Sequence, residues 1–234
     1  MDMQARYVVN PAVPATRGFH VKDPLSALSH FIGFLLAIIG TFPLMTKAAY
    51  VGCSMPEMLS LCAFMGGMIG LYGASTAYHT FDLEEVGHMR LKRLDHTMIY
   101  FLIVGSYLPV CVFSLWGAGG EQLALLVTMV AGVGIVFSLF WVNCPKWLSS
   151  AIYILLGWLS VSALPQMLVH LPRPALVWLV VGGVLYTIGG VIYALKLSWL
   201  EKKIPGFGAH ELFHLFVLAG TACHYVMVLH YLVV

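Results

Sequence analysis

Charged side chains are scarce in this chain. Only 9% of its 234 residues are Asp, Glu, Lys or Arg, whereas 60% are hydrophobic, and the mean hydropathy is +0.90. A single soluble core of this size cannot bury so much apolar surface, which excludes a soluble globular domain. The chain also lacks a basic patch of useful size, so no nucleic-acid partner is expected. The composition indicates an integral membrane protein.

Paired cysteines and a signal peptide are lacking too. The five cysteines follow no paired spacing and predict free thiols rather than a disulfide framework; they are Cys53, Cys62, Cys111, Cys144 and Cys223. Residues 1–23 contain no apolar core long enough for a signal peptide. We therefore expect a polar, cytoplasmic N-terminal tail over 1–23 and a single membrane domain over 24–234.

Seven apolar runs follow, each near the ~20 residues that a helix needs to cross a bilayer. They cover about Leu25–Met45, Met58–Tyr78, Thr97–Leu115, Leu123–Val142, Leu148–Leu168, Ala175–Leu195 and Glu211–Val233. The fold predicted is all-α, a seven-transmembrane helix bundle. The charged linker Thr80–Leu94 predicts a short interfacial helix. In the second run, Gly66-x-x-x-Gly70 with Gly73 predicts close approach of a neighbouring helix.

Basic residues predict the orientation in the membrane. Ten of the twelve Lys and Arg residues fall in the N-terminal tail and the even-numbered linkers, and only Lys47 and Arg173 fall on the other side. By the positive-inside rule, the N-terminus is cytoplasmic and the C-terminus is outside. The expected location is the cell (inner) membrane, which the protein crosses several times.

Two histidines at the start of the last run suggest metal binding. His210 and His214 are four residues apart, so on a helix they share one face, with Cβ atoms roughly 5–6 Å apart. Such pairs also occur by chance in soluble helices. Inside a membrane, however, an unpartnered imidazole is costly and an ionisable residue is a functional candidate. Imidazole nitrogens suit zinc, but a tetrahedral site needs more than two ligands.

Polar residues of three other runs lie at the same membrane level as this pair. The second run ends at His79, the third opens at Asp95, and the first opens with Ser26 and His30. His79 is the simplest third zinc ligand. Three histidines with one open position are typical of a catalytic zinc, which lowers the pKa of bound water to about 7 and polarises a carbonyl. The polar residues at this membrane depth therefore predict a hydrolytic metal site.

Each supporting residue has two interpretations. Asp95 can hold or deprotonate the attacking water, or it can cap the third helix. Ser75, one turn before His79, can donate to an oxyanion or bond back to its own helix. His30 and Ser26 can orient a metal ligand, or His30 can be an interface histidine with satisfied hydrogen bonds.

Two residues of the last run have other predicted roles. Glu211 is in the first turn, where a carboxylate favourably meets the helix dipole. His224 lies about 15 Å beyond His214 at 1.5 Å per residue, too far for the same ion. We expect it to form an interhelical hydrogen bond.

Together, Ser75-x-x-x-His79, Asp95 sixteen residues later, and His210-x-x-x-His214 in a seventh run resemble the haemolysin III branch of the progestin and adipoQ receptor family. The resemblance implies seven transmembrane helices and a zinc ion in the cytoplasmic leaflet. Its ligands would be His79, His210 and His214, with Asp95 holding the zinc-bound water and Ser75 nearby. Adiponectin receptors and alkaline ceramidases in the wider group look like lipid amidases, and bacterial members are usually named for cytolytic activity.

The first motif departs from the family pattern. The family has Glu-x-x-Asn-x-x-x-His, whereas this chain has Asp23, Ser26 and His30 at those positions. The acid is shorter and a serine replaces the asparagine. We expect this change to affect a substrate contact and to leave metal binding untouched.

Three functions remain open from the sequence. The first is an intramembrane zinc hydrolase of a lipid amide or ester, with a membrane lipid as substrate. The second is a pore-forming cytolysin, and the third is a lipid-sensing, receptor-like protein with structural zinc. A homo-oligomer is compatible with each of them.

Overall fold

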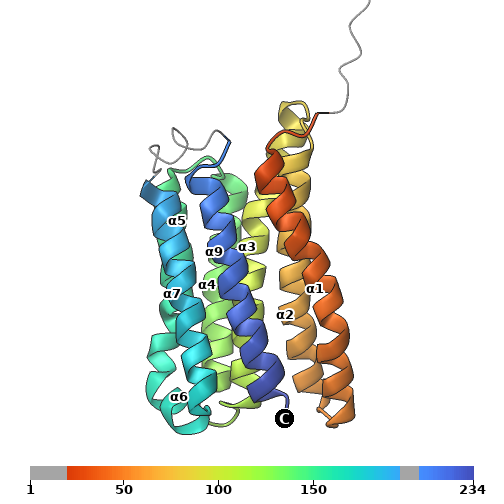
Figure 1. The fold of residues 1–234 in the computed structure, drawn as a ribbon. Helices are drawn as coiled ribbons and strands as arrows, with labels where there is room; N and C mark the ends of the chain where they lie inside the picture. The colour runs from red at the N-terminus through yellow and green to blue at the C-terminus, as the bar shows by residue number, and fades with distance from the viewer. Residues whose placement is uncertain (1–19, 196–205) are drawn as a thin grey trace, which may run out of the picture.

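A computed structural model describes residues 20–195 and 206–234. Within those two ranges all regular structure is helical, and seven helical stretches are long and apolar enough to cross a membrane. Figure 1 shows them side by side in one bundle, with α1 starting at the opposite end from the C-terminus. The all-α, seven-span prediction is confirmed. The cytoplasmic side and the 1–23 tail stay predictions, since residues 1–19 and the basic residues Lys196, Lys202 and Lys203 lie outside the described ranges.

Every span begins before its predicted apolar run, whereas the third, fourth and last spans end slightly before the predicted ends. The first four are α1 (Pro24–Tyr50), α2 (Met55–Thr80), α3 (Glu85–Phe113) and α4 (Gly120–Phe140). The fifth consists of α5 (Lys146–Gly157), the 3₁₀ helix η1 (Trp158–Ala163) and α6 (Leu164–His170). The last two are α7 (Arg173–Leu195) and α9 (Ala209–Met227), which continues into the π-helical turn η2 (Val228–Leu232). All five cysteines are free, as predicted.

The predicted interfacial helix over Thr80–Leu94 is wrong. Thr80 ends α2, and α3 begins at Glu85 and runs unbroken through Asp95 to Phe113. The charged residues before Asp95 are good helix formers, so nothing interrupts the helix where the apolar run begins. Asp95 therefore lies inside α3, and its interpretation as a helix cap is also wrong.

Glycines let α2 and α3 approach at backbone distance. A Cβ at Gly67 would lie 2.9 Å from the Phe101 carbonyl oxygen, and one at Gly105 would lie 2.7 Å from the Ala63 carbonyl oxygen. Of the predicted glycines, Gly70 and Gly73 do approach neighbours, because a Cβ there would meet Met98 of α3 or Phe34 of α1, whereas a Cβ at Gly66 would meet nothing within 4 Å. Gly67, which was not predicted, makes the backbone contact with α3. This contact fixes α2 beside the helix that carries Asp95.

Three hydroxyls hold α9 between α2 and α7. The Tyr72 hydroxyl donates to Thr221 Oγ1 at 2.8 Å, and the Tyr186 hydroxyl lies 2.8 Å from the same oxygen. These bonds join helices that are far apart in sequence. They set the position of α9, whose first turns carry His210 and His214.

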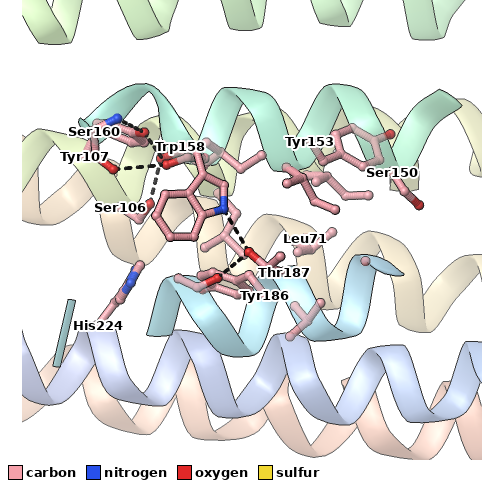
Figure 2. A pocket seen from close by; sticks show the side chains of 18 of the residues that line it. Leu71, Ser106, Tyr107, Ser150, Tyr153, Trp158, Ser160, Tyr186, Thr187 and His224 are labelled. Carbon is pink, nitrogen blue, oxygen red and sulfur yellow. Dashed lines mark hydrogen bonds between the residues drawn. The ribbon is translucent and has the colours of Figure 1, made fainter. Parts of the chain in front are cut away.

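A cavity of about 280 Å³ lies inside the bundle between α3, the fifth span, α7 and α9 (Figure 2). Asp95, Ser75 and His210 line one part of it, and Tyr107 and His224 line the part further along the same helices. Between these polar groups the lining is mainly apolar.

Candidate metal centre

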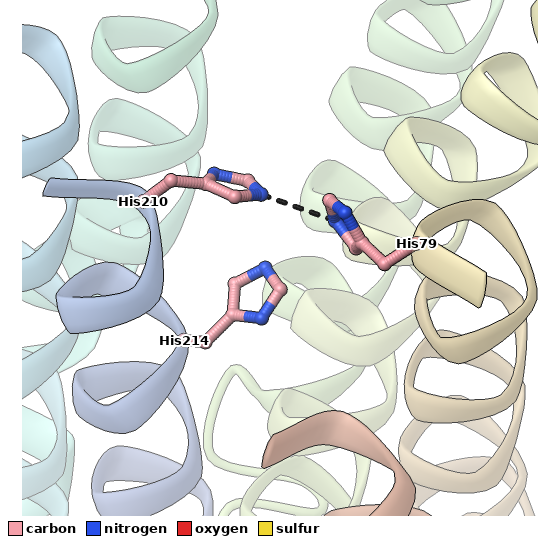
Figure 3. Close-up of side chains that lie close together, drawn as sticks. All are labelled: His79, His210 and His214. Atoms are coloured by element: carbon pink, nitrogen blue, oxygen red, sulfur yellow. Dashed lines mark hydrogen bonds between the residues drawn. The ribbon is translucent and has the colours of Figure 1, made fainter. Parts of the chain in front are cut away.

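Three imidazoles from α2 and α9 meet at one point (Figure 3). His79 Nε2 lies 3.1 Å from His210 Nε2, and each of the three histidines His79, His210 and His214 offers a ligand atom within 4.8 Å of the other two. His79 and His214 are each 2% exposed. The structure thus brings together the three predicted ligands across 131 residues of chain.

The cluster fits a small tetrahedral cation. Two nitrogens bound to one zinc ion at 2.0–2.1 Å with tetrahedral angles are about 3.3 Å apart, close to the observed His79–His210 separation. Neutral imidazoles with no acidic residue among the three match the donor set of a three-histidine zinc site. The residues present therefore fit a zinc ion.

Two ligands are oriented by hydrogen bonds to their other ring nitrogen. His79 Nδ1 lies 2.8 Å from Asp23 Oδ2, and His214 Nδ1 lies 3.3 Å from the Ser29 hydroxyl. Both contacts leave Nε2 directed toward the other histidines. A carboxylate behind a histidine fixes its tautomer and ring orientation, and strengthens it as a metal ligand.

Asp23 is a site residue that sequence reasoning missed. The expectation that the altered first motif leaves metal binding untouched stays a prediction, but the acidic residue of that motif contacts the candidate ligand His79 directly. The backbone reinforces this pairing, since the Asp23 N–H donates to the His79 carbonyl oxygen at 2.9 Å. The predicted topology was a signal for this pairing, because α1 starts at the same end of the bundle at which α2 ends.

His30 lies directly behind His214. Their rings stack with centroids 3.6 Å apart and an interplanar angle of 6°. His30 is 3% exposed, and neither of its ring nitrogens has a hydrogen-bond partner in the described ranges. It supports the ligand by ring packing, and the alternative of an interface histidine with satisfied hydrogen bonds does not describe it.

Ser26 acts on the helix that carries two ligands rather than on a ligand itself. Its hydroxyl donates to Glu211 Oε1 at 2.7 Å, while Glu211 Oε2 accepts from the Gly208 N–H at 2.8 Å. Glu211 therefore caps α9, as its position predicted, and also ties that helix to α1. This bond fixes the turn from which His210 projects.

Asp95 and Ser75 share the cavity with His210 and His214. Asp95 is 8% exposed and Ser75 is 1% exposed. The two side chains are close enough for the Ser75 hydroxyl to interact with the Asp95 carboxyl, and the Ser75 hydroxyl does not bond back to its own helix. Both side chains line the cavity, where they can meet a bound molecule.

His96 is a second residue near the site that was not predicted from the sequence. It lines the cavity beside Asp95, and its Nδ1 lies 3.3 Å from the Tyr153 hydroxyl. His224, by contrast, behaves as predicted, with Nε2 placed 3.4 Å from the Leu179 carbonyl oxygen of α7.

The fold and site define a multi-pass membrane protein with a histidine cluster near one end of a seven-helix bundle. The chain belongs to the haemolysin-III related family, whose model matches residues 19–225. It is 34% identical over 216 residues to a hemolysin-3 homolog of Bacillus subtilis (strain 168), covering 92% of this chain and 97% of the relative. The sequence-based identification of the haemolysin III branch is confirmed.

Two further relatives extend the comparison. Hemolysin-3 of Bacillus cereus is 32% identical over 212 residues, covering 90% of this chain and 92% of the relative. The adiponectin receptor protein of Drosophila melanogaster is 28% identical over 212 residues, covering 84% of this chain and 48% of the relative. Bacterial relatives fit the expected inner-membrane location.

Proposed function

We propose that this protein is an intramembrane zinc-dependent hydrolase that cleaves an amide or ester bond of a lipid. The observation that carries the proposal is the convergence of three imidazoles where a largely apolar cavity also presents Asp95 and the Ser75 hydroxyl. A reactive carbonyl placed there has a metal site, a carboxylate and a donor within one enclosure. A site whose metal is only structural needs neither the carboxylate nor the hydrogen-bond donor.

Each residue has a distinct role in this reaction. His79, His210 and His214 hold the zinc, which when bound polarises a carbonyl and acidifies water. Asp95 accepts a proton from the attacking water as its oxygen bonds to the carbonyl carbon. Ser75 donates a hydrogen bond to the carbonyl oxygen as negative charge develops on it. When the carbon–nitrogen or carbon–oxygen bond breaks, Asp95 returns the proton to the leaving atom.

The cavity supports a lipid as substrate. Its lining beyond Asp95 is mainly apolar and includes the aliphatic side chains of Ile99, Leu102 and Leu179. Burial of an acyl chain there would stabilise the complex by about 0.8 kcal/mol per methylene group. A water-soluble amide lacks this contribution, so we expect acyl amides and esters to be preferred.

Turnover of labelled ceramide and other acyl amides or esters by purified protein in lipid nanodiscs tests the proposal. We expect His210→Ala to abolish hydrolysis, and Asp95→Asn to lower it about 10²–10⁴-fold while zinc remains bound. His230→Ala on the exposed end of the last span and Asp82→Asn in the exposed linker are matched controls. Wild-type protein that holds zinc but cleaves none of these lipids contradicts the proposal and favours a sensor with structural zinc.

The names of the two Bacillus relatives make pore formation the second candidate. Purified protein added to dye-loaded liposomes tests it. Release that persists in His79→Ala and His210→Ala would favour a cytolysin whose activity is independent of the cluster.

A further inference from the structure

Among the described residues that line the cavity, the exposed ones gather in one region of the bundle surface. The lining residues from α2, α3 and α9 are buried or half-buried. The exposed lining residues lie around η1 and on the facing side of α7; they are Gly157, Trp158, Val161, Leu164 and Val180. The cavity therefore opens sideways, between η1 and α7.

The spacing of the fifth span and α7 explains this opening. Toward the histidine cluster the two helices touch, because a Cβ at Gly190 would lie 3.0 Å from Ile154 Cδ1. Two turns before Gly190 in α7, and so further from the histidine cluster, a Cβ at Gly183 would meet nothing within 4 Å. A Cβ at Gly157 in the fifth span would also meet nothing within 4 Å. The helices thus separate where α5 gives way to η1.

A buried tyrosine of α3 stabilises the break in the fifth span. The Tyr107 hydroxyl donates to the Gly157 carbonyl oxygen at 2.5 Å and accepts from the Ser160 N–H at 2.9 Å. These two backbone groups belong to the residues on either side of the start of η1. The opening is therefore a built feature of the fold, supported from inside the bundle.

One hydrogen bond spans the cluster side of the opening. Trp158 Nε1 donates to Thr187 Oγ1 at 2.9 Å, and the Thr187 hydroxyl donates to the Gly183 carbonyl oxygen at 2.8 Å (Figure 2). The indole of Trp158 is 43% exposed and also lines the cavity. Trp158 and Gly183 thus border the passage from the cavity to the lipid.

The opening lies about one acyl chain away from the cluster. Tyr107, which marks its level, comes twelve residues after Asp95 in α3, or about 18 Å at 1.5 Å per residue. One leaflet of the hydrocarbon core is about 15 Å thick, half of ~30 Å. A chain with its carbonyl at the cluster reaches the opening after about the depth of one leaflet.

We propose that the far end of a bound acyl chain leaves the bundle between η1 and α7, so that the site accepts chains longer than its cavity. Gly183 and Trp158 then determine chain-length tolerance, since their size sets the width of the passage. The inference rests on the proposed function, which places the acyl carbonyl at the histidine cluster.

Binding of fatty acids to protein in phosphatidylcholine nanodiscs tests the inference without hydrolysis. The probes are two saturated fatty acids, one about 15 Å long and one about twice that length, each displacing a fluorescent short-chain fatty acid. We expect wild type to bind both, and Gly183→Phe to weaken the longer one at least about tenfold while the shorter one changes less than about threefold. Gly132→Phe, at an exposed glycine of α4 with open space around it, is the matched control.

Val180→Trp, a substitution at an exposed rim position, should give the same selective loss if Gly183→Phe fails to fold. Wild type that binds only the shorter acid, or neither, overturns the inference. Equal weakening of both acids by Gly183→Phe and Val180→Trp also overturns it. Absence of lipid turnover counts against the hydrolase alone, because the chain-length comparison depends only on binding.

Discussion

Asp23 Oδ2 and His79 Nδ1 lie 2.8 Å apart and join the residue before α1 to the last turn of α2. Because this carboxylate orients a metal ligand, Asp23→Asn should lower zinc affinity about 10–100-fold. Zinc titration against a competing chelator measures the change. Asp23→Glu, which restores the longer acid of the family motif, should recover most of the affinity.

Asp82→Asn is the control for loss of a negative charge at the same end of the bundle. Asp82 is exposed and belongs to the linker between α2 and α3. An equal loss of affinity in Asp82→Asn and Asp23→Asn would mean that general electrostatic attraction, rather than the hydrogen bond to His79, explains the effect.

Removing one ligand should abolish both zinc binding and the stability that zinc confers. We expect His79→Ala to be purified without zinc, and its melting temperature to stay constant as zinc is added. Wild type should gain about 2.7 kcal/mol at a zinc concentration 100 times the Kd. His224→Ala removes another buried histidine that lies outside the cluster, so it should still bind zinc. Metal analysis showing stoichiometric zinc in His79→Ala would contradict the assignment.

The close contact of α2 and α3 makes a prediction about neighbouring glycines. Gly67→Ala and Gly105→Ala each place a Cβ within 3.0 Å of a carbonyl oxygen and should destabilise the protein by about 1–3 kcal/mol. Gly66→Ala, next to Gly67 but facing open space, should be neutral or slightly stabilising. Thermal unfolding of the three variants in one detergent gives the comparison, and equal melting temperatures would rule out the contact.

The bond between Ser26 and Glu211 should contribute to the stability of the metal-free protein. Ser26→Ala removes a buried donor to a carboxylate, and we expect a loss of about 1.5–3 kcal/mol. Unfolding measured in excess chelator separates this effect from metal binding. Ser162→Ala, an exposed serine that bonds only within its own segment, should change the melting temperature little.

The spans and the histidine cluster could be predicted from the sequence because each depends on information carried by short segments. Hydropathy alone marks a transmembrane helix, and the positions of His79, His210 and His214 at ends of apolar runs place them at one membrane level. Three histidines at the same depth in a small helix bundle are expected to lie close together.

The missed features depend on contacts between segments. Asp23 precedes a proline at a helix start, where an acid has a sufficient local explanation, so its bond to His79 is not apparent from sequence. The break at Trp158 is also hidden, because an apolar run has the same hydropathy whether it is α-helical or 3₁₀, and the stabilising hydroxyl of Tyr107 comes from another helix.

The cluster draws its ligands from opposite parts of the chain, and this affects biogenesis. His79 enters the membrane with the second span, whereas His210 follows 131 residues later in the last one. A nascent chain therefore has one imidazole of three until its final helix is inserted. If the cluster holds zinc as proposed, chains truncated before α9 should be purified without metal, because they lack two of the three ligands.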